Sequence, residues 1–267
     1  MRNNIFKIDY QTKILKRARI SSDLVNHNFL IKLSENQILN KMKNFSSNVE
    51  VLVEFGSNSS IGELFSKSND CFFISTDNSI DFLKKNSFSL NNLVVDENNL
   101  PFKKKSVSGV ISCLYVDSTF NSEILFSNVH KILKNNGFLI FSVFGTKTMQ
   151  NIKEYFIKIE EKKYSGISLR FHQLFDVDLI GNKLKQVGFK NVIVETEIIN
   201  VKYNSLFKLM HDLRGMGITN KLSNRSKFFT PKGLFSEVNE CLIKDNKNKE
   251  FFVPFEIITL TAWKENL

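Results

Sequence analysis

Cysteine, proline and glycine are all scarce in this chain. Three cysteines, three prolines and 11 glycines occur among its 267 residues. The cysteines are odd in number and far apart, with no CxxC pair, so the sequence predicts neither a disulfide framework nor a zinc site. The four histidines form no HxxxH or HxxEH pair, and we therefore expect no metal centre.

Long hydrophobic runs are also missing. No stretch approaches the ~20 apolar residues that a membrane-spanning helix needs, and the N-terminus lacks the apolar core of a secretory signal. The cysteine usage fits a reducing compartment. We therefore expect a cytoplasmic protein without a membrane span.

Acidic residues are outnumbered by basic ones. Lysine and arginine total 37 against 27 aspartates and glutamates, which gives a net charge of +10. Such a balance suits an acidic protein partner, nucleic acid or an anionic membrane surface, although a solvated, lysine-rich surface would give the same count. No RNA-binding motif accompanies the charge, so the sequence does not favour nucleic acid as a partner.

Short apolar runs alternate with amphipathic helical segments through the middle of the chain. The runs predict strands that are buried on both faces, and their alternation with helices is typical of a parallel, doubly wound α/β sheet. We expect strands at 49–55, 71–76, 93–95, 109–116 and 138–144, with helices at 61–67, 79–86, 122–134, 147–160 and 177–187.

Two longer β-like runs, 191–201 and 252–263, are separated by a helical segment and favour an antiparallel strand pair at the end of the sheet. A polar, basic region with helical periodicity precedes the first strand. The expected parts are an N-terminal helical cover at 1–48, a core at 49–201, an inserted helical segment at 202–250 and a last core strand at 251–267.

The turn after the first strand is a candidate ligand site, because ligands of such sheets bind at the carboxyl ends of the strands. It runs from Glu54 through Gly56 and Asn58 to Ser60. A nucleotide-binding turn needs glycine where backbone approaches the ligand, and only Gly56 is present, although asparagine also tolerates positive φ. The alternative is a plain turn between strand and helix.

Polar residues follow the next strands at the same edge. Asp77, with Asn78 beside it, could accept hydrogen bonds from ribose hydroxyls, or Asp77 could cap the helix that follows. Asp96 and Glu97 could meet an adenine amino group, or they could belong to a charged surface loop. Ser112 lies near the end of the fourth strand, beside these groups.

Four stretches stand in the order and spacing of the class I S-adenosylmethionine-dependent methyltransferases, a family that the chain resembles over nearly its whole length. They are VEFG at 53–56, TDNS at 76–79, VVDENNLPF at 94–102 and HKILKNNGFLIFSVFG at 130–145. The resemblance implies a Rossmann-like seven-stranded sheet with helices on both faces and a helical insertion before the last strand. It also implies S-adenosylmethionine as the cofactor, bound by the core at 49–201. The implied cofactor-binding residues are Glu54, Gly56, Asn58, Ser60, Asp77, Asn78, Asp96, Glu97 and Ser112.

Two families within this superfamily are similar to the chain. One is the malonyl-carrier-protein methyltransferase of biotin synthesis, and the other is a respiratory complex I assembly factor that hydroxylates an arginine. Both share the stretch from Phe6 to Ala18. The FGxxT turn at 144–148, the run FKLMHDLRGMGITN at 207–220 and the ending at 255–264 resemble the assembly factor more closely. The implied partner is an acidic carrier protein or a complex I subunit.

The inserted segment would form a substrate lid. Gly215 and Gly217 would break its helix and present Arg214 and Asn220 from a loop. The planar fork of arginine suits a carboxylate or a phosphate, although a surface arginine and a capping asparagine would look the same in the sequence. These two residues are our candidate substrate contacts in the lid.

The basic stretch around Arg17 resembles the cover that the family places over its cofactor cleft, with a solvated basic helix as the alternative. Tyr10 could stack on a ligand or hydrogen-bond to it, or it could be packed against the core. We count both residues as candidate substrate contacts, which adds the N-terminal cover to the expected binding surface.

The first motif departs from the family, because Asn58 and Ser60 stand where glycines are usual. Side chains at these positions would block the cofactor or displace it. Two functions therefore remain open: a methyltransferase acting on a protein or carrier-protein substrate, and a non-catalytic assembly or binding module on a degraded methyltransferase fold. Methyl transfer depends mainly on proximity and orientation, so the sequence identifies no catalytic side chain.

Overall fold

The structure, a computed structural model, describes residues 9–20, 24–43, 49–86, 89–116, 121–164, 166–171, 174–226, 230–246 and 249–265. Phe6, at the start of the N-terminal motif, lies outside these ranges. The strands are β1 (Val51–Phe55), β2 (Phe72–Asp77), β3 (Asn92–Val94), β4 (Val107–Cys113), β5 (Leu133–Phe144), β6 (Lys190–Tyr203) and β7 (Phe251–Trp263).

Ten helices surround these strands in the described part of the chain. They are α1 (Tyr10–Ile20), α2 (Leu24–His27), α3 (Phe29–Met42), α4 (Ile61–Asn69), α5 (Ile80–Asn86), α6 (Ser122–Ile132), α7 (Gln150–Tyr164), α8 (Val177–Val187), α9 (Leu206–Gly215) and α10 (Lys232–Lys244). None of them is long and apolar enough to cross a membrane.

The seven strands form one sheet in the order β3-β2-β1-β4-β5-β7-β6. Strands β1 to β5 run parallel, while β7 is antiparallel to both of its neighbours, β5 and β6. The expected fold class and the expected antiparallel pair at the end of the sheet are both confirmed. Because the order reverses at β1 and β4, the carboxyl ends of these two strands form the switch point at which ligands of such sheets bind.

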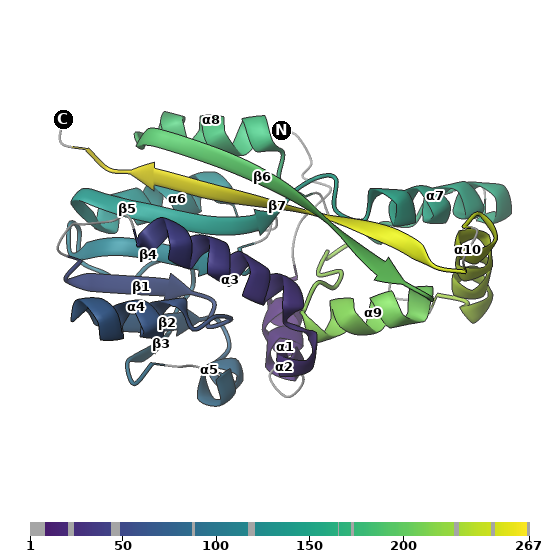
Figure 1. Cartoon of the computed structure of the whole chain (residues 1–267), viewed down its shortest axis with the longest axis horizontal. Helices are drawn as coiled ribbons and strands as arrows, with labels where there is room; N and C mark the ends of the chain where they lie inside the picture. Colours follow the sequence, from purple (N-terminus) through teal and green to yellow (C-terminus); the bar gives the residue numbers. More distant parts are fainter. Residues whose placement is uncertain are drawn as a thin grey trace.

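Successive residues of the central strands enter two different cores, as expected for strands covered on both faces. Val53 and Val110 pack with α6 and α8, whereas Leu52 and Ile111 pack with α3 and α4. All four side chains are fully buried. Helix α3 thus belongs to the sheet's own core, and the part of the N-terminal region that covers the carboxyl edge is α1 with α2 (Figure 1).

Local sequence signals fix some helix ends well. Asp176 caps α8 by accepting hydrogen bonds from the backbone of Asp178 and Leu179, and Gly188 ends the helix with φ 112°. In contrast, Asn136 and Gly137 do not end α6, although the sequence predicts that they do. They lie inside β5, where Asn136 has φ 61° and the pairing with β4 shifts register, which is a bulge.

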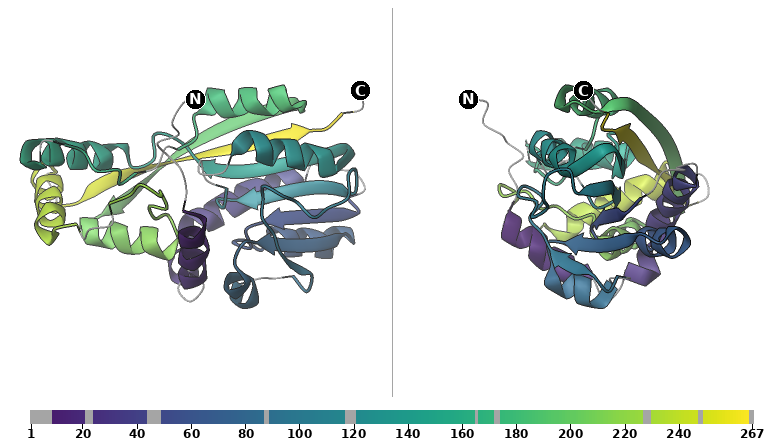
Figure 2. Two further views of the ribbon diagram at one scale, coloured as in Figure 1. Left: turned by 180° about the vertical axis from the view of Figure 1, so that it is seen from behind. Right: turned by 90° about the vertical axis from the view of Figure 1, so that its left-hand side faces the viewer.

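The last two strands are much longer than β1, and they project beyond the rest of the sheet (Figure 1). Helices α7, α9 and α10 gather around the projecting part (Figure 1), and we call this group of helices the lid; α7 joins it, although we expected 147–160 to belong to the core. Helix α1 lies between the lid and the core of the sheet in Figure 1 and in the left view of Figure 2. Its N-terminal end is tied to the lid, because the amide of Asp9 donates to the carbonyl of Lys221 at 3.0 Å.

Candidate functional site

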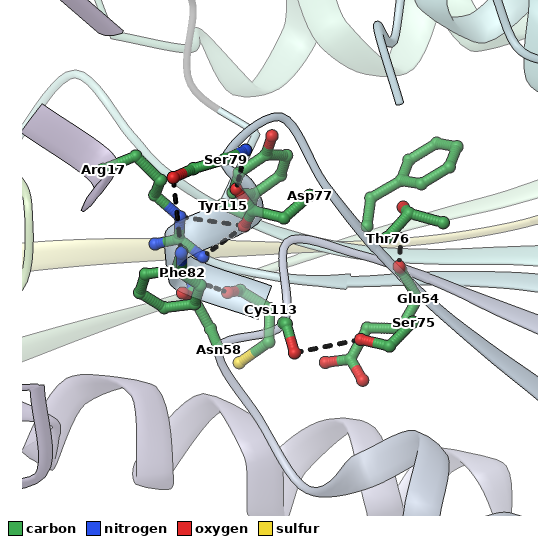
Figure 3. Close-up of polar contacts among 12 residues, drawn as sticks. Arg17, Glu54, Asn58, Ser75, Thr76, Asp77, Ser79, Phe82, Cys113 and Tyr115 are labelled. Carbon is green, nitrogen blue, oxygen red and sulfur yellow. Dashed lines mark hydrogen bonds and ion pairs between the residues drawn. The ribbon is translucent and has the colours of Figure 1, made fainter. Parts of the chain in front are cut away.

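The turn after β1 is held to the protein by its own side chains. Ser57 accepts a hydrogen bond from Ser75 Oγ at 2.9 Å, and the Asn58 side-chain amide donates to the carbonyl of Cys113 at 3.0 Å (Figure 3). Ser60 donates to Glu35. The positions that carry glycine in the resembled family are therefore used for internal contacts, and the turn is a closed loop rather than an open cradle.

Asp77, the expected ribose ligand, forms an ion pair with Arg17 of α1. Arg17 Nη2 and Nε lie 2.8 and 2.9 Å from Asp77 Oδ2. The guanidinium also stacks on Phe82, with Cζ 3.4 Å from the ring centroid (Figure 3). The other carboxylate oxygen of Asp77 accepts the amide of Ser79 at 2.9 Å, and Ser79 rather than Asp77 caps α5, because its hydroxyl accepts the amide of Phe82 at 3.3 Å. Arg17, which we expected to contact substrate, is thus buried in the expected cofactor cleft.

Glu97 and Asp96 separate, although they are adjacent in the chain. Asp96 is exposed and accepts hydrogen bonds from Asn98 within its own turn. Glu97 is buried, hydrogen-bonds to the Tyr115 hydroxyl and lies 3.6 Å from Lys13 Nζ. Burial raises the pKa of Glu97, and the nearby Lys13 ammonium opposes that shift. Of the two carboxylates, only Glu97 belongs to the cleft.

Tyr115 covers the one glycine that remains in the first motif. A Cβ added to Gly56 would lie 1.9 Å from Tyr115 Cγ, so the ring rests directly on the Gly56 backbone. Gly56 has φ 74°, as expected for a residue that must be glycine. The close approach that this glycine permits in a nucleotide-binding turn is used here by an internal aromatic side chain.

The groups expected to hold S-adenosylmethionine are covered by the chain's own side chains, Asp77 by Arg17 and Gly56 by Tyr115. The cavity beside them, between α1, Tyr115 and the lid, is about 40 Å³, whereas small-molecule sites usually measure roughly 300 Å³ or more. Two groups at this edge still lack an internal partner in the described part of the chain: the buried Asn78 side-chain amide makes no hydrogen bond through either atom, and Asn58 Oδ1 accepts none. The polar groups of a nucleoside site are thus partly kept, while its volume is filled.

Two further expected cofactor residues are interior residues of the sheet. Glu54 is buried in β1 and accepts a hydrogen bond from Ser59, and burial raises the pKa of its carboxyl group to about 8. Ser112 is buried in β4 and donates to the carbonyl of Phe55 at 3.1 Å. Both side chains thus join neighbouring parts of the sheet and its first turn.

Of the three remaining candidates, Arg214 and Asn220 belong to the lid, whereas Tyr10 lies near Asp96 and Glu97. Tyr10 is partly exposed at the start of α1, where burial and the charges of Asp96 and Glu97 raise the pKa of its hydroxyl to about 12. Arg214 is exposed at the end of α9. The Asn220 amide donates to the carbonyl of Leu169 at 2.6 Å and accepts the amide of Leu222 at 3.0 Å, so it joins two segments of the lid.

The two glycines after Arg214 have different roles from those the sequence suggested. Helix α9 continues to Gly215, and a Cβ there would lie 2.2 Å from the His27 ring, so Gly215 permits close packing of α2 on α9. Only Gly217, with φ 76°, adopts the left-handed conformation that turns the chain. The expected sharp turn therefore depends on one glycine and not on two.

Helix contact also creates a side-chain cluster that spacing in the sequence did not indicate. His27 Nδ1 lies 2.8 Å from Asp212 Oδ1, and the rings of His27 and His211 are 4.7 Å apart in an edge-on arrangement. Each of these three side chains offers one nitrogen or oxygen atom that could coordinate a metal ion, and these atoms all lie within 4.8 Å of one another. His27 is distant in sequence from the adjacent pair His211 and Asp212, so no HxxxH spacing could have revealed the cluster.

An apolar cavity of about 360 Å³ lies between α7, α9 and α10, with Lys16 of α1 at its edge. We call it the lid cavity. Phe156, Leu209 and Met210 contribute to its walls, and Arg214 lies at its border. Its volume falls within the roughly 300–1,000 Å³ of small-molecule sites. The space that the sheet-edge cleft lacks is therefore found in the lid.

Comparisons with known proteins agree with this fold. No family model matches the chain. Human mitochondrial arginine-hydroxylase NDUFAF5 is 26% identical over 98% of this chain and 77% of its own length. The malonyl-[acyl-carrier protein] O-methyltransferase of Gallionella capsiferriformans is 25% identical over 63% of this chain and 56% of its own length. Matches to other forms of the hydroxylase span about half of those proteins.

Solved structures show the same architecture. A structure of an S-adenosylmethionine-dependent methyltransferase from Archaeoglobus fulgidus has a TM-score of 0.52 at 14% identity, covering 88% of this chain and 94% of its own. The resemblance to class I S-adenosylmethionine-dependent methyltransferases is thereby confirmed at the level of fold and relatives. Sequence analysis did not identify Tyr115 and Phe82 as residues of the site. Both are large aromatic side chains at the carboxyl edge of the sheet, where a ligand-binding cleft would need space.

Proposed function

We propose that this chain, which has the methyltransferase fold, is a binding module that captures an acidic protein partner on its lid and works without S-adenosylmethionine. The observation that carries the proposal is the filled cleft. Arg17 neutralises Asp77, the residue expected to hold the ribose, and Tyr115 covers Gly56. The groups that would bind the cofactor are thus engaged with one another.

The energetic cost of opening the cleft supports this function. A ligand would have to separate Arg17 from Asp77, and breaking a buried ion pair costs about 3–5 kcal/mol if neither charge finds a new partner. That cost would weaken binding by roughly two to four powers of ten. The ligand would also have to displace the Tyr115 ring, which is buried against Gly56.

The partner is proposed from charge and from the relatives. The chain carries a net charge of +10, and Arg214 is exposed at the end of α9 beside the lid cavity. The names of the relatives refer to an acyl-carrier protein and to arginine. An acidic carrier protein or a respiratory complex I subunit would present carboxylates to this surface, and arginine recognises carboxylates with paired hydrogen bonds.

A second function is favoured by Asn78. Its unpaired, buried amide is the kind of group that a nucleoside would satisfy. In this alternative the chain is a methyltransferase whose α1 withdraws from the cleft when the cofactor enters. The two functions differ in the expected effect of removing Arg17, because α1 either obstructs the cofactor or contributes to its binding.

Calorimetric titration with S-adenosylmethionine separates these functions. We expect no binding to the wild-type chain at millimolar cofactor, and measurable binding to the Arg17→Ala, Tyr115→Ala double variant. Arg19→Ala is the matched control, because Arg19 is exposed on the same helix and its removal changes the charge equally. Micromolar binding by the wild type, lost in Arg17→Ala, would instead establish the methyltransferase alternative.

Partner capture is tested separately, with purified acyl-carrier protein and no cofactor present. Arg214→Ala should weaken capture by about 1–3 kcal/mol, the range of a charge-assisted hydrogen bond. Thermal stability should stay unchanged, because the side chain is exposed. Unchanged affinity in a folded variant would remove Arg214 from the proposed surface.

A further inference from the structure

Aliphatic, thioether and aromatic side chains contribute most of the surface of the lid cavity, although polar and charged residues line it as well. Ile152 and Phe156 come from α7, and Leu209, Met210 and Leu213 come from α9. These helices have their backbone groups paired internally, so the walls offer no row of free backbone partners. A peptide inserted here would leave its own amides unpaired, whereas an alkyl chain has no such groups.

Five cations border the same cavity. Two of them are neutralised by internal carboxylates, Arg170 by Glu160 at 2.6 Å and Arg225 by Asp9 at 3.2 Å. The others are Lys16, Lys153 and Arg214.

No carboxylate in the described part of the chain pairs with Lys16, Lys153 or Arg214. Lys16 donates to the carbonyl of Asn220, and Lys153 Nζ lies 5.9 Å from the Phe171 ring centroid. Burial lowers the pKa of both lysines, and for Lys16 the nearby charge of Arg225 adds to the shift. An apolar cavity with an excess of positive charge at its border suits a ligand that is apolar over most of its length and anionic at one end.

We infer that the lid cavity binds a linear aliphatic carboxylate, with the chain among the α7 and α9 side chains and the carboxylate at the border formed by Lys16, Lys153 and Arg214. This inference deepens the proposed function, since it names a ligand for the same lid. It does not depend on the state of the sheet-edge cleft. A carboxylate would supply the negative charge that these three cations lack.

The test uses the purified full chain and three probes with the same alkyl length: decanoate, decanol and decyltrimethylammonium, each below its aggregation limit. Titration calorimetry should show saturable binding of decanoate. Decanol should bind roughly tenfold to a hundredfold more weakly, because it lacks the charge that strengthens hydrogen bonds to the cations. The quaternary ammonium should not bind.

Two pairs of variants on α9 locate the ligand. Met210→Trp fills the cavity and should abolish decanoate binding, while Phe207→Trp adds the same ring at an exposed position outside the cavity and should not. Arg214→Gln should weaken binding at least about tenfold, while Lys208→Gln, exposed on the same helix and outside the cavity, should leave it unchanged. Circular dichroism establishes that each variant is folded.

Failure to bind decanoate by the folded wild type would overturn the inference, as would equal binding of decanol or an unchanged affinity in Met210→Trp. The proposed function fails by a different result, namely tight binding of S-adenosylmethionine to the wild type. Loss of decanoate binding with partner capture intact would therefore remove the small ligand and leave the binding module.

Discussion

Arg17 and Asp77 form a buried ion pair that joins the N-terminal helix to the second strand, with Nη2 and Nε of Arg17 lying 2.8 and 2.9 Å from the same carboxylate oxygen. The pair explains how α1 is positioned at the carboxyl edge of the sheet. It also removes from solvent the carboxylate that the fold would otherwise offer to a ribose. One contact therefore stabilises the cover and closes the cleft.

Asp77→Asn is expected to lower the free energy of unfolding by about 3–5 kcal/mol, because Arg17 would stay buried without its counter-charge. Urea denaturation measures the change. Replacing both residues, as in Arg17→Met with Asp77→Asn, should recover part of the loss, since no unpaired charge remains. If Asp77→Asn leaves stability unchanged, the carboxylate is not engaged by Arg17 in solution and the cleft is open.

Gly56→Ala is expected to be strongly destabilising. A Cβ would lie 1.9 Å from the Tyr115 ring, and alanine would also have to adopt φ 74°. Overpacking and backbone strain of this kind cost about 2–5 kcal/mol together. Thermal denaturation of Gly56→Ala, alone and combined with Tyr115→Ala, measures how much of the loss of stability comes from the steric clash with the Tyr115 ring. The combination should recover only the packing part, whereas equal stability of Gly56→Ala and wild type would show that Tyr115 does not rest on Gly56.

Glu54 should make stability fall as pH rises. Its folded pKa of about 8 lies above the ordinary value of 4.5, so the folded state holds a proton that the unfolded state releases. The stabilisation is full below about pH 4.5 and is lost as pH rises toward 8. Glu54→Gln keeps the shape and removes the titration.

We therefore expect Glu54→Gln to exceed the wild type in melting temperature at pH 8, with a much smaller difference at pH 5. The free-energy difference at pH 8 should be on the order of a few kcal/mol. Ser59 can still donate its hydrogen bond to the glutamine oxygen. A difference that does not change with pH would mean that Glu54 is ionised in the folded protein.

Gly215 and Gly233 form a matched pair for testing how α2 packs on α9. A Cβ at Gly215 would lie 2.2 Å from the His27 ring, while a Cβ at Gly233 in α10 would meet nothing within 4 Å. Gly215→Ala should lower the free energy of unfolding by about 1–3 kcal/mol. Gly233→Ala should raise it by up to about 1 kcal/mol, because alanine favours the helix. Equal effects in chemical denaturation would contradict the packing.

The sheet could be predicted because its signals are local and repeat. Each apolar run ends at a glycine or at a polar residue. Helix α8 ends at Val187, where Gly188 allows the left-handed turn. The parallel order also predicted that Gly56, Asp77 and Glu97 share one edge, since carboxyl ends of parallel strands meet there. Where one local pattern fits two structures the prediction was wrong: Asn136 and Gly137 suggested a helix end and form a bulge.

The contents of the cleft could not be predicted from the same signals. Arg17 pairs with Asp77 only because α1 lies between the lid and the sheet, which depends on tertiary contacts. Tyr115 follows β4 in sequence, and nothing local indicates that its ring turns back onto Gly56. The same holds for His27 and Asp212, which helix packing brings to 2.8 Å. Motifs identified the groups at the edge, whereas the fold determined their partners.

The most direct test of the filled cleft is a crystal structure of the wild-type chain grown with millimolar S-adenosylhomocysteine. We expect Arg17 to remain within about 3 Å of Asp77 and the Tyr115 ring to remain on Gly56, with no ligand density between them. A nucleoside whose ribose hydroxyls hydrogen-bond to Asp77, with Arg17 and Tyr115 displaced, would contradict the account and establish this chain as a cofactor-binding methyltransferase.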